Sequence, residues 1–459
     1  MENCWTLHVK GLGKLSEVNV TVAPLTLFVG DNNSGKSYLM GLLYTLLNIR
    51  FYAHGYDLCL KSEEYGECAS LVLEKLESCR QGRKIVWEMD GTAQESFARL
   101  LNKVLRKNIK RIARRTFNTD IPIGKISIEF PRHEVRRRII LTCRKEGEEE
   151  NRIYIVRPDG YNSGRAREAE SLQEMAFFVG FLLEYMLKQG FKRNSMADAN
   201  YLPSSRTGFL LAYKPLIGAS LADAYDSGKE AGFQGKLTRP CSDFLKNLAQ
   251  LSQEGATETF RPVVEFIEQR MVCGRVGLHG DTPQPSILYR SETAGVELPM
   301  HLASGVVTEL APLLLLLQYQ PDIHAIFMEE PETGLHPKLQ LLMAQVIIRI
   351  LNMGIPMFVT THSDNILQHI NNMIKLSNQP TARKKKLLEK YGYDGKMDLL
   401  SGKDVSMYQF DVGEGDGHSV VQPLTYNSYG FEVPTFNGTF RELLRESRAF
   451  ESDGDEDDE

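Results

Sequence analysis

Hydrophobic and polar positions repeat along the chain with two different periods, and the change of period separates strands from helices. Apolar residues alternate with polar ones at 5–9 and 18–22, which predicts two β-strands joined by a glycine-rich turn. The run 25–29 is almost wholly apolar and predicts a buried strand, followed by a helix to about Asn48. From 287 to the end of the 360s, predicted strands and helices alternate as in an open α/β sheet. We therefore predict an α/β fold.

The middle of the chain carries patterns of both kinds. Residues 66–115 have mostly helical periodicity, whereas 124–157 alternate or are rich in β-branched residues and predict a β segment. A further apolar helix is predicted over 168–190, ended by Gly190, and residues 216–272 are again mainly helical. No stretch sustains coiled-coil heptads for several turns, so long helical arms are not expected.

The loop after the buried strand has the spacing of a phosphate-binding loop. Residues 30–37 read Gly-Asp-Asn-Asn-Ser-Gly-Lys-Ser and fit G-x-x-x-x-G-K-[ST] between a strand and a helix. The glycines let the backbone approach a polyphosphate, and the N–H groups of the loop face the anion. Lys36 is expected to reach the β- and γ-phosphates of ATP, and the Ser37 hydroxyl to bind Mg²⁺. A chance match is the alternative, which the strand–helix setting disfavours. The predicted ATP-binding residues of the loop are Gly30, Asn32, Asn33, Ser34, Gly35, Lys36 and Ser37.

A second predicted strand, 323–328, ends in two adjacent carboxylates. Glu329 is the candidate for holding Mg²⁺ through water, and Glu330 is the candidate general base that orients the attacking water. Aspartate is the usual residue on the metal side, and Glu329 departs from that pattern. A charged strand end facing solvent is the alternative. The position of the pair after a P-loop and before another strand with a polar exit favours the catalytic interpretation.

Two further segments are candidates for contact with phosphate. The strand 356–361 is followed by His362, which is placed to contact the γ-phosphate, although a lone histidine is more often structural. Ser304 and Gly305 open an apolar helix, and a helix N-terminus attracts anions. An ordinary N-cap is the alternative for Ser304 and Gly305.

Together these motifs resemble the ABC-type ATPase heads of the SMC, RecF and OLD group. The resemblance rests on 22–37, on Glu-Glu-Pro-Glu-Thr-Gly-Leu-His-Pro at 329–337 and on Thr-Thr-His-Ser at 360–363. It implies a P-loop NTPase head with a mixed sheet, flanking helices, and α+β and helical insertions. It also implies that Ser304-Gly305 is the signature motif, which completes the ATP site of a partner subunit, and that Leu335-His336 lies at the D-loop. Residues 202–206 are more weakly similar to a Pro-x-x-Arg motif of OLD-like ATPases.

The resemblance also suggests a division of the chain. Seven of the last nine residues are acidic, a composition that predicts disorder. The expected parts are an N-terminal ATPase lobe at 1–50, an α+β insertion with a basic helix at 51–200, a return to the ATPase core at 201–215, a helical insertion at 216–284, a C-terminal ATPase lobe at 285–445 and a disordered acidic tail at 446–459.

Two features of SMC proteins and OLD nucleases are not predicted for this sequence, and their absence narrows the choice of subgroup. SMC proteins carry long coiled coils, which this sequence does not predict. OLD nucleases carry a TOPRIM domain after the histidine, but the acidic residues of the segment 411–416 do not have the spacing of the TOPRIM metal-binding acids. The chain therefore looks most like a stand-alone ATPase of a two-gene anti-phage system, of the AriA type in PARIS systems, with Septu-type ATPases as the near alternative. That resemblance implies a homo-oligomeric scaffold that holds a separate, toxic TOPRIM-type nuclease and releases it when a phage protein is sensed.

Composition excludes few classes of protein. Hydrophobic residues make up 42% of the chain and charged residues 25%, as in soluble globular proteins, and the net charge of −5 argues against a protein that coats nucleic acid. The seven cysteines form no C-x-x-C pair, so neither a zinc site nor a disulfide framework is indicated, and the cytoplasm is the expected compartment. No signal peptide is apparent, and the apolar run 310–317 is too short to cross a membrane.

One segment in the middle of the chain is strongly basic. On a single helix its cations form one face, which is a candidate surface for DNA or for an acidic phage trigger protein. Arg132, Arg136, Arg137 and Arg138 follow nearby. A solvated face balanced by acids elsewhere is the alternative. The cations of this basic face are Lys103, Arg106, Lys107, Lys110, Arg111, Arg114 and Arg115.

Two rival functions remain open from the sequence. A RecF-like repair ATPase would bind DNA directly and would need no partner protein. A structural scaffold would bind ATP without hydrolysing it, which the presence of Glu330 and His362 disfavours.

Overall fold

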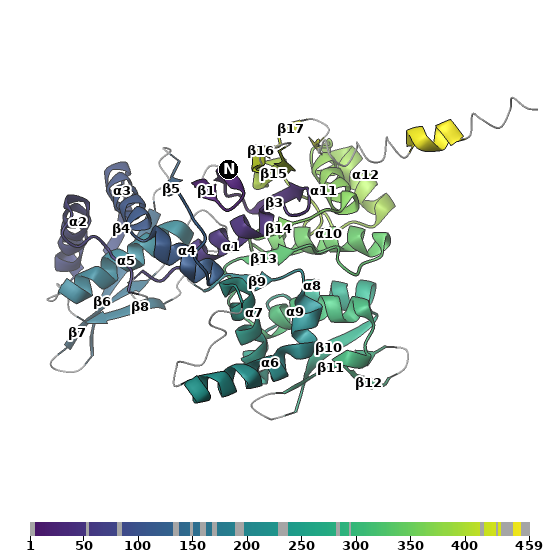
Figure 1. Ribbon diagram of the computed structural model, residues 1–459, viewed down its shortest axis with the longest axis horizontal. Helices are drawn as coiled ribbons and strands as arrows, with labels where there is room; N and C mark the ends of the chain where they lie inside the picture. The colour runs from purple at the N-terminus through teal and green to yellow at the C-terminus, as the bar shows by residue number, and fades with distance from the viewer. Residues whose placement is uncertain are drawn as a thin grey trace, which may run out of the picture.

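The computed structural model describes residues 5–51, 55–79, 85–131, 137–146, 150–156, 162–167, 172–188, 197–227, 237–280, 285–292, 295–413, 417–427, 430–432 and 444–450. These residues form an α/β fold built on one large mixed sheet (Figure 1). Its strands are, in spatial order, β5 (Lys125–Glu129), β1 (Thr6–Leu12), β2 (Leu15–Thr21), β16 (Ser419–Pro423), β15 (Val405–Val412), β3 (Leu25–Gly30), β14 (Met357–Thr360), β13 (Ile326–Glu329) and β9 (Asn200–Leu202).

The half of the sheet that carries the motifs is parallel. β15, β3, β14, β13 and β9 pair in parallel, so their carboxyl ends meet at one edge. In the register of these strands Glu329 lies beside Thr360, and Gly30 lies beside Phe410. Ligands of open α/β sheets bind at this edge, because the loops that leave parallel strands converge there. β1 pairs antiparallel with β2 and β5, which gives the sheet its mixed character.

Strand residues alternate between two apolar cores, one on each face of the sheet. Phe28, Phe327 and Phe358 belong to the core that contains α1 (Lys36–Leu47), and the rings of Phe327 and Phe358 stack with their centroids 4.2 Å apart. Leu27 and Met328 belong to the other core. That core also contains residues of α9 (Gly305–Tyr319), α10 (Pro337–Asn352) and α11 (Asp364–Ser377). Both faces of the parallel strands are therefore buried, as expected for a sheet between helices.

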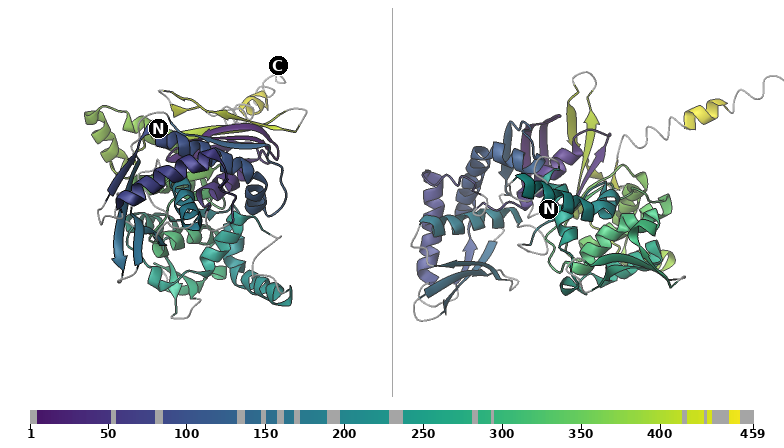
Figure 2. Two further views of the ribbon diagram at one scale, coloured as in Figure 1. Left: turned by 90° about the vertical axis from the view of Figure 1, so that its left-hand side faces the viewer. Right: turned by 60° about the horizontal axis from the view of Figure 1, so that its bottom comes forward.

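The segment between α1 and β9 forms a lobe to one side of the sheet (Figures 1 and 2). Its helices are α2 (Glu63–Cys79), α3 (Gly91–Lys107), α4 (Ile109–Phe117) and α5 (Leu172–Lys188), and its own sheet has the order β4 (Ile85–Met89), β6 (Arg137–Glu146), β7 (Glu150–Val156) and β8 (Asn162–Arg167). β5 also comes from this segment but joins the main sheet. Gly190, the predicted end of α5, lies outside the described residues.

The segment after β9 is mainly helical and then forms a small sheet. It comprises α6 (Arg206–Ser227), α7 (Arg239–Ala249), η1 (Gln253–Gly255), α8 (Arg261–Ile267), η2 (Glu268–Val272), β10 (Gly274–His279), β11 (Ser286–Ser291), β12 (Glu297–Pro299) and η3 (Met300–Leu302). β10 pairs with β11 across position 284, the expected end of the helical insertion. The remaining elements are α12 (Thr381–Tyr391), η4 (Gly402–Asp404), β17 (Tyr426–Asn427) and β18 (Gly430–Phe431).

The C-terminal region is described only in part. Residues 444–450, which include Glu446 of the predicted tail, are helical, and 451–459, which hold its other acidic residues, lie outside the described residues. Among the helices that are described, none combines the length and the apolarity needed to span a bilayer.

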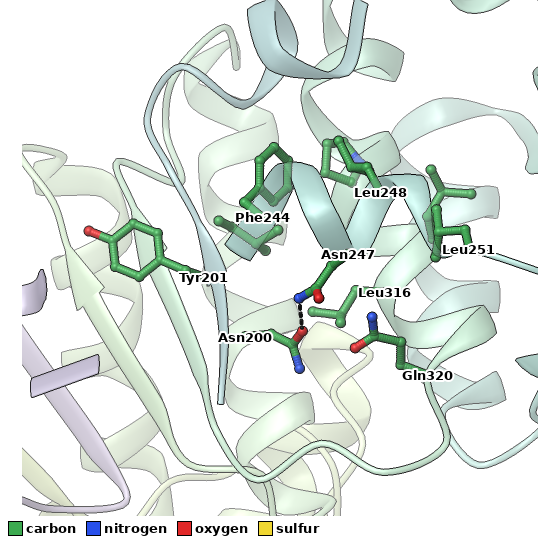
Figure 3. A pocket seen from close by; sticks show the side chains of 11 residues that line it. Asn200, Tyr201, Phe244, Asn247, Leu248, Leu251, Leu316 and Gln320 are labelled. Atoms are coloured by element: carbon green, nitrogen blue, oxygen red, sulfur yellow. Dashed lines mark hydrogen bonds between the residues drawn. The ribbon is translucent and has the colours of Figure 1, made fainter. Parts of the chain in front are cut away.

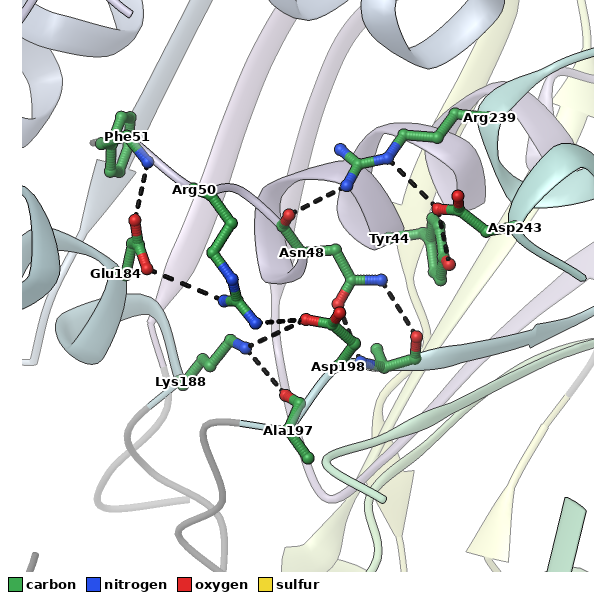
Figure 4. A network of polar contacts seen from close by, with 11 residues as sticks. Tyr44, Asn48, Arg50, Phe51, Glu184, Lys188, Ala197, Asp198, Arg239 and Asp243 are labelled. Atoms are coloured by element: carbon green, nitrogen blue, oxygen red, sulfur yellow. Dashed lines mark hydrogen bonds and ion pairs between the residues drawn. The ribbon is translucent and has the colours of Figure 1, made fainter. Parts of the chain in front are cut away.

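A buried polar network anchors the far end of α1 (Figure 4). The Asn48 side chain exchanges two hydrogen bonds with the backbone of Ala199, of 3.0 and 2.8 Å, at the start of β9. Arg239 of α7 donates to the Asn48 carbonyl at 3.0 Å. Glu184 of α5 accepts a 2.7 Å bond from the Phe51 N–H, and burial raises its pKa to about 7. The helix that follows the P-loop is thus held by three different elements, which fixes the position of the loop at its other end.

Candidate nucleotide-binding site

The P-loop has the backbone geometry that its sequence predicts. Gly30 ends β3 with φ of +116°, and a Cβ atom there would lie 2.1 Å from the Phe410 carbonyl oxygen of β15. Gly35 precedes α1 with φ of +93°. Both are left-handed conformations that only glycine adopts readily, so neither position tolerates a side chain without strain. Gly30 is required by the packing of β15 as well as by the approach of a phosphate.

Lys36 points back into the loop. Its side chain is buried, and Nζ donates to the Gly30 carbonyl at 3.1 Å, to the Ser34 hydroxyl at 3.2 Å and to the Asp31 carbonyl. Burial lowers the pKa of Lys36 to about 8, and the negative charge of Glu330 is the largest effect that opposes this shift. Lys36 is therefore a partly desolvated cation inside the loop, within electrostatic reach of Glu330.

The other predicted loop residues divide into buried and exposed groups. Ser34 is buried and donates a 2.7 Å bond to the Asp31 carbonyl, which closes the turn. Asn32, Asn33 and Ser37 are exposed, and Asn33 adopts a left-handed conformation. Ser37 lies in the first turn of α1 and is exposed, so its hydroxyl is available to a ligand, as its predicted role requires.

Glu329 has the environment expected of a metal-site carboxylate. It is 8% exposed, and its Oε2 accepts a 3.3 Å bond from the Ser204 N–H. Its buried Oε1 has no hydrogen-bond partner among the described residues. Buried polar atoms without a partner are rare and call for an explanation. Carboxylate and hydroxyl oxygens are ligands that Mg²⁺ prefers, so Glu329 and Ser37 fit a magnesium site at this edge of the sheet.

Glu330 is held in a strained backbone conformation. Its φ is +43°, which is uncommon for a residue other than glycine. The Glu330 N–H donates to the Thr360 carbonyl at 2.9 Å, and its carbonyl accepts from Arg206 Nη2 at 3.3 Å. Thr333 donates its hydroxyl to Glu330 Oε2 at 3.4 Å. Strain of this kind persists when surrounding contacts over-determine it, and it is concentrated at functional sites.

His362 lies near both Lys36 and Glu330. Its ring is half-buried, and burial, followed by the Lys36 charge, lowers its pKa, while Glu330 opposes the shift. The Glu332 carboxylate accepts from the His362 N–H and, at 2.9 Å, from the Thr361 hydroxyl, so it fixes the strand exit that carries the histidine. The imidazole is therefore neutral at neutral pH and can donate one hydrogen bond to a phosphate oxygen.

Within the described residues, no hydrogen bond or ion pair joins Ser304 or Gly305 to the P-loop of the same chain. Both are exposed at the start of α9, and the Ser304 side chain makes no capping hydrogen bond. Both backbone carbonyls accept hydrogen bonds from Thr308 of α9. Leu302, just before them, is 62% exposed. This end of α9 is thus open to a second molecule.

Sequence reasoning missed Gln340 and Glu309 and gave Arg206 only as part of the weakly similar segment 202–206. Gln340 accepts a 2.7 Å bond from the Ser363 hydroxyl and donates to the Leu335 carbonyl at 2.9 Å, so it joins the predicted D-loop to the segment of His362. Arg206 is fully buried beneath the carboxylate pair, and Glu309 pairs with it at 3.1 Å. An acid inside the apolar helix after Gly305 is a signal that would have identified Glu309.

An apolar pocket between β9, α7 and α9 is separate from the nucleotide site (Figure 3). Phe244, Leu248, Leu251 and Leu316 line it, and no P-loop residue does. Asn247 donates to the Asn200 side chain at 2.9 Å on one side of it. The lining carries no charged group, so this pocket is not a phosphate site.

The prediction of one continuous basic helix is wrong. Asn108 breaks it into α3 and α4, because the Asn108 side chain bonds to the Val104 carbonyl and to both backbone groups of Asp57. Some cations of the basic face are paired, such as Lys103 with Glu64 and Arg114 with Asp120. Arg106, Lys107 and Lys110 are exposed and form no ion pair in the described part of the chain. Arg132, Arg136 and the side chains of Arg137 and Arg138 lie outside the described residues.

Comparisons with known proteins agree with this geometry. A family model described as an AAA ATPase domain matches residues 246–367, which include Glu330 and His362. A search of curated proteins finds no match. The domain match and the P-loop together support an ATPase of the AAA/ABC type. The mixed sheet and its flanking helices confirm the predicted α/β fold, and no long coiled coil occurs within the described residues.

Solved structures that align with most of this chain include SMC head domains. An SMC head bound to the C-terminal winged-helix domain of ScpA is 12% identical, with 92% of this chain and 97% of that chain covered and a TM-score of 0.37. The SMC head domain from Thermotoga maritima is 11% identical, with 93% and 100% covered and a TM-score of 0.31. A head with an extended coiled coil bound to a ScpA domain, derived from Pyrococcus furiosus, is 12% identical, with 96% and 98% covered and a TM-score of 0.35. Scores this low assign no function.

Proposed function

We propose that the chain hydrolyses ATP at a site that a second copy of the chain completes. One observation carries this proposal. Lys36, Glu330 and His362 converge at one edge of the sheet, whereas Ser304 and Gly305 are exposed, uncapped and not bonded to that edge. A helix N-terminus with a free hydroxyl and free N–H groups is suited to bind the γ-phosphate held by another molecule.

In the proposed mechanism each of these groups has one role. The oxygen of a water molecule bonds to the γ-phosphorus, the bond from that phosphorus to the bridging oxygen of ADP breaks, and the proton of the water passes to Glu330. Lys36 and His362 stabilise the charge on the phosphate oxygens. Ser37 and Glu329 would hold Mg²⁺, which when bound neutralises negative charge on the phosphates.

The variant Glu330→Gln tests the assignment of the base. Because an amide cannot accept the proton, kcat is expected to fall by about 100-fold or more, while ATP still binds. With ATP and Mg²⁺ the variant is expected to accumulate as a dimer, measured by light scattering after gel filtration. The control is Glu389→Gln on the exposed helix α12, which leaves the rate unchanged. Hydrolysis at the parental rate in Glu330→Gln would show that Glu330 is not the base.

The resemblance to anti-phage ATPases extends the proposal to a biological role. In this role the ATP-bound oligomer is a cytoplasmic scaffold that holds a separate TOPRIM-type nuclease and releases it when a phage trigger protein docks. Nucleotide-controlled assembly suits such a switch, because ATP binding changes which surfaces meet. The test is the mass of the purified protein with ATP and Mg²⁺, alone and with the product of the neighbouring gene. Retention of that product on a discrete oligomer supports the scaffold, and failure to retain it contradicts the scaffold.

Direct DNA binding, as in RecF, is the second candidate function. The observation in its favour is the exposed, unpaired set Arg106, Lys107 and Lys110 on the basic face. This function predicts hydrolysis that DNA stimulates and a DNA affinity that falls steeply with salt. Reversal of these three charges together with Arg114 separates the two functions. Loss of DNA binding supports the repair function, whereas loss of triggering with no DNA binding in the parent supports docking of an acidic protein.

A further inference from the structure

Arg206 is the largest buried charge of the site that the proposed mechanism does not use. It opens α6, immediately after the turn that leaves β9, and its side chain is fully buried. A buried guanidinium is stable only if its donors are bonded and its charge is paired. The partners of Arg206 therefore show what it holds together.

The first set of partners is the backbone of the carboxylate pair. Nη1 of Arg206 donates to the Glu329 carbonyl at 2.9 Å, and Nη2 donates to the Glu330 carbonyl at 3.3 Å. Nη1 also lies 3.3 Å from the Pro203 carbonyl. The guanidinium thus bonds to the carbonyls on both sides of the Glu330 Cα, where the chain adopts the left-handed conformation. These bonds stabilise a conformation that the residue would otherwise rarely adopt.

The second partner is Glu309 of α9. Nε of Arg206 donates to the Glu309 carbonyl at 3.1 Å, and Nη2 lies 3.1 Å from the Glu309 carboxylate oxygen Oε2. The other carboxylate oxygen accepts a 2.6 Å bond from the Thr207 hydroxyl. The backbone carbonyl and the carboxylate of Glu309 are therefore both bonded to the start of α6. A shift of α9 would thus also move Arg206.

Glu309 also lies one helical turn beyond Gly305. Between them, Thr308 donates its hydroxyl to the Gly305 carbonyl at 2.9 Å, so the exposed first turn of α9 is continuous with Glu309. On its other side, Glu309 packs against Gly334, where an added Cβ would lie 2.9 Å from Glu309 Cγ. Gly334 precedes Leu335 and His336, the predicted D-loop. A single buried pair therefore touches the signature end of α9, the D-loop turn and the backbone of Glu330.

We propose that Arg206 and Glu309 are positioning residues that link the partner-facing end of α9 to the general base of the same chain. The inference rests on the proposed function, in which Ser304 and Gly305 contact ATP bound to another copy. Engagement of α9 by that ATP sets the position of Glu309, and Arg206 transmits it to the peptide between Glu329 and Glu330. Each head then hydrolyses its own ATP fast only when its signature helix is occupied.

The variant Arg206→Lys tests the link. A lysine keeps the charge but cannot bond to the carbonyls of Glu329, Glu330 and Glu309 together. The Kd for ATP and the ATP-dependent dimer in a Glu330→Gln background are expected to stay parental, whereas kcat falls about 10- to 100-fold, the scale of a misplaced catalytic group. The parental kcat rises with protein concentration as dimers form, and the variant loses this rise. A parental kcat and concentration dependence in Arg206→Lys would overturn the proposal.

A double replacement separates positioning from mere stability. Arg206→Met with Glu309→Leu exchanges the buried pair for apolar residues, which often preserves or increases stability. The double variant is expected to fold and to bind ATP but to lack stimulated hydrolysis, and recovery of the parental kcat would overturn the proposal. Glu309→Gln, which keeps the size and a hydrogen-bond acceptor, provides a second test if the double variant does not fold, with the same loss of stimulation expected. Arg261→Lys, in an exposed pair with Glu265, is the matched control.

Failure of the inference and failure of the proposed function give different results. If Glu330→Gln keeps parental hydrolysis, the proposed function itself fails. If Glu330→Gln behaves as expected but the Arg206 and Glu309 variants retain concentration-dependent stimulation, only the link fails.

Discussion

At the scale of single residues, the site combines groups that are costly to bury with contacts that compensate for the cost. Lys36 is desolvated inside its loop, Glu329 has a buried oxygen without a partner among the described residues, and Glu330 is strained. In the proposed function the phosphate oxygens would pair with Lys36 and Mg²⁺ would pair with Glu329, which would offset the cost of burying these two groups. These residues therefore preorganise the site at the expense of stability.

The lowered pKa of Lys36 predicts how ATP binding depends on pH. Since the pKa is about 8 rather than 10.5, the free protein loses this cation as pH rises through about 8. The affinity for ATP, measured by calorimetry, is expected to fall by up to about tenfold per pH unit above that point. In Lys36→Arg, which stays charged, the affinity is weaker but flat over the same range. An affinity of the parent that does not change between about pH 8 and about pH 10 would contradict this assignment.

The lowered pKa of Lys36 affects the free energy of unfolding in the opposite direction to its effect on ATP affinity. The unfolded chain binds more protons at Lys36 than the folded protein does between about pH 8 and 10.5. The contribution of Lys36 to the free energy of unfolding therefore rises with pH in this window, because the cost of burying its charge is removed.

At the scale of elements, the break between α3 and α4 shows how one side chain redirects the chain. Asn108 is buried, and its amide satisfies the backbone of Asp57 as well as the Val104 carbonyl. At this break the Asn108 amide pairs both backbone groups of Asp57. The basic face is therefore split over two helices.

Replacement of Asn108 by alanine tests this explanation. Loss of the three hydrogen bonds of this buried side chain is expected to lower the free energy of unfolding by about 1–3 kcal/mol. Urea denaturation measures the change. Lys107→Ala, at the neighbouring exposed position, is expected to change the free energy of unfolding by less than about 0.5 kcal/mol. Equal effects of the two variants would contradict the role of Asn108.

At the scale of the whole molecule, the proposed dimer would bury the exposed apolar residues around the start of α9. Leu302 is 62% exposed and Val296 is 52% exposed, and both precede Ser304 in the chain. Burial of a leucine contributes about 1.5–3 kcal/mol to an interface. Closure of two heads would bury this position in both.

The variant Leu302→Asp is expected to weaken the ATP-dependent dimer. In a Glu330→Gln background its dimer Kd, measured by sedimentation with ATP and Mg²⁺, should rise about tenfold or more, since a buried carboxylate replaces apolar contact. ATP binding by the monomer is expected to be unchanged. Tyr391→Asp, at an exposed aromatic residue on α12, is the control and should leave the dimer intact. A dimer equally strong in Leu302→Asp would place the interface elsewhere.

The candidate residues of the site could be proposed from the sequence because they lie in short segments. The P-loop, the pair Glu329-Glu330 and His362 each follow a strand directly, and parallel strands bring their carboxyl ends to one edge. The fold class and the ATPase activity were predicted correctly for this reason. β4 was not foreseen within a stretch of helical periodicity, because a strand of Ile85–Met89 forms only when β6 supplies its hydrogen bonds.

The sequence by itself determined the order of the motifs, the conformation of Gly30 and Gly35 and the class of ligand, because these depend on residues adjacent in the chain. Only the tertiary structure decided that Arg206 would bond to Glu330, more than a hundred residues away, and that Glu309 would pair with it. It also decided that Asn108 would break a helix and that Ser304 would lie apart from the P-loop of its own chain. Buried polar groups must find partners wherever packing places them, and that choice depends on the whole fold rather than on any local pattern.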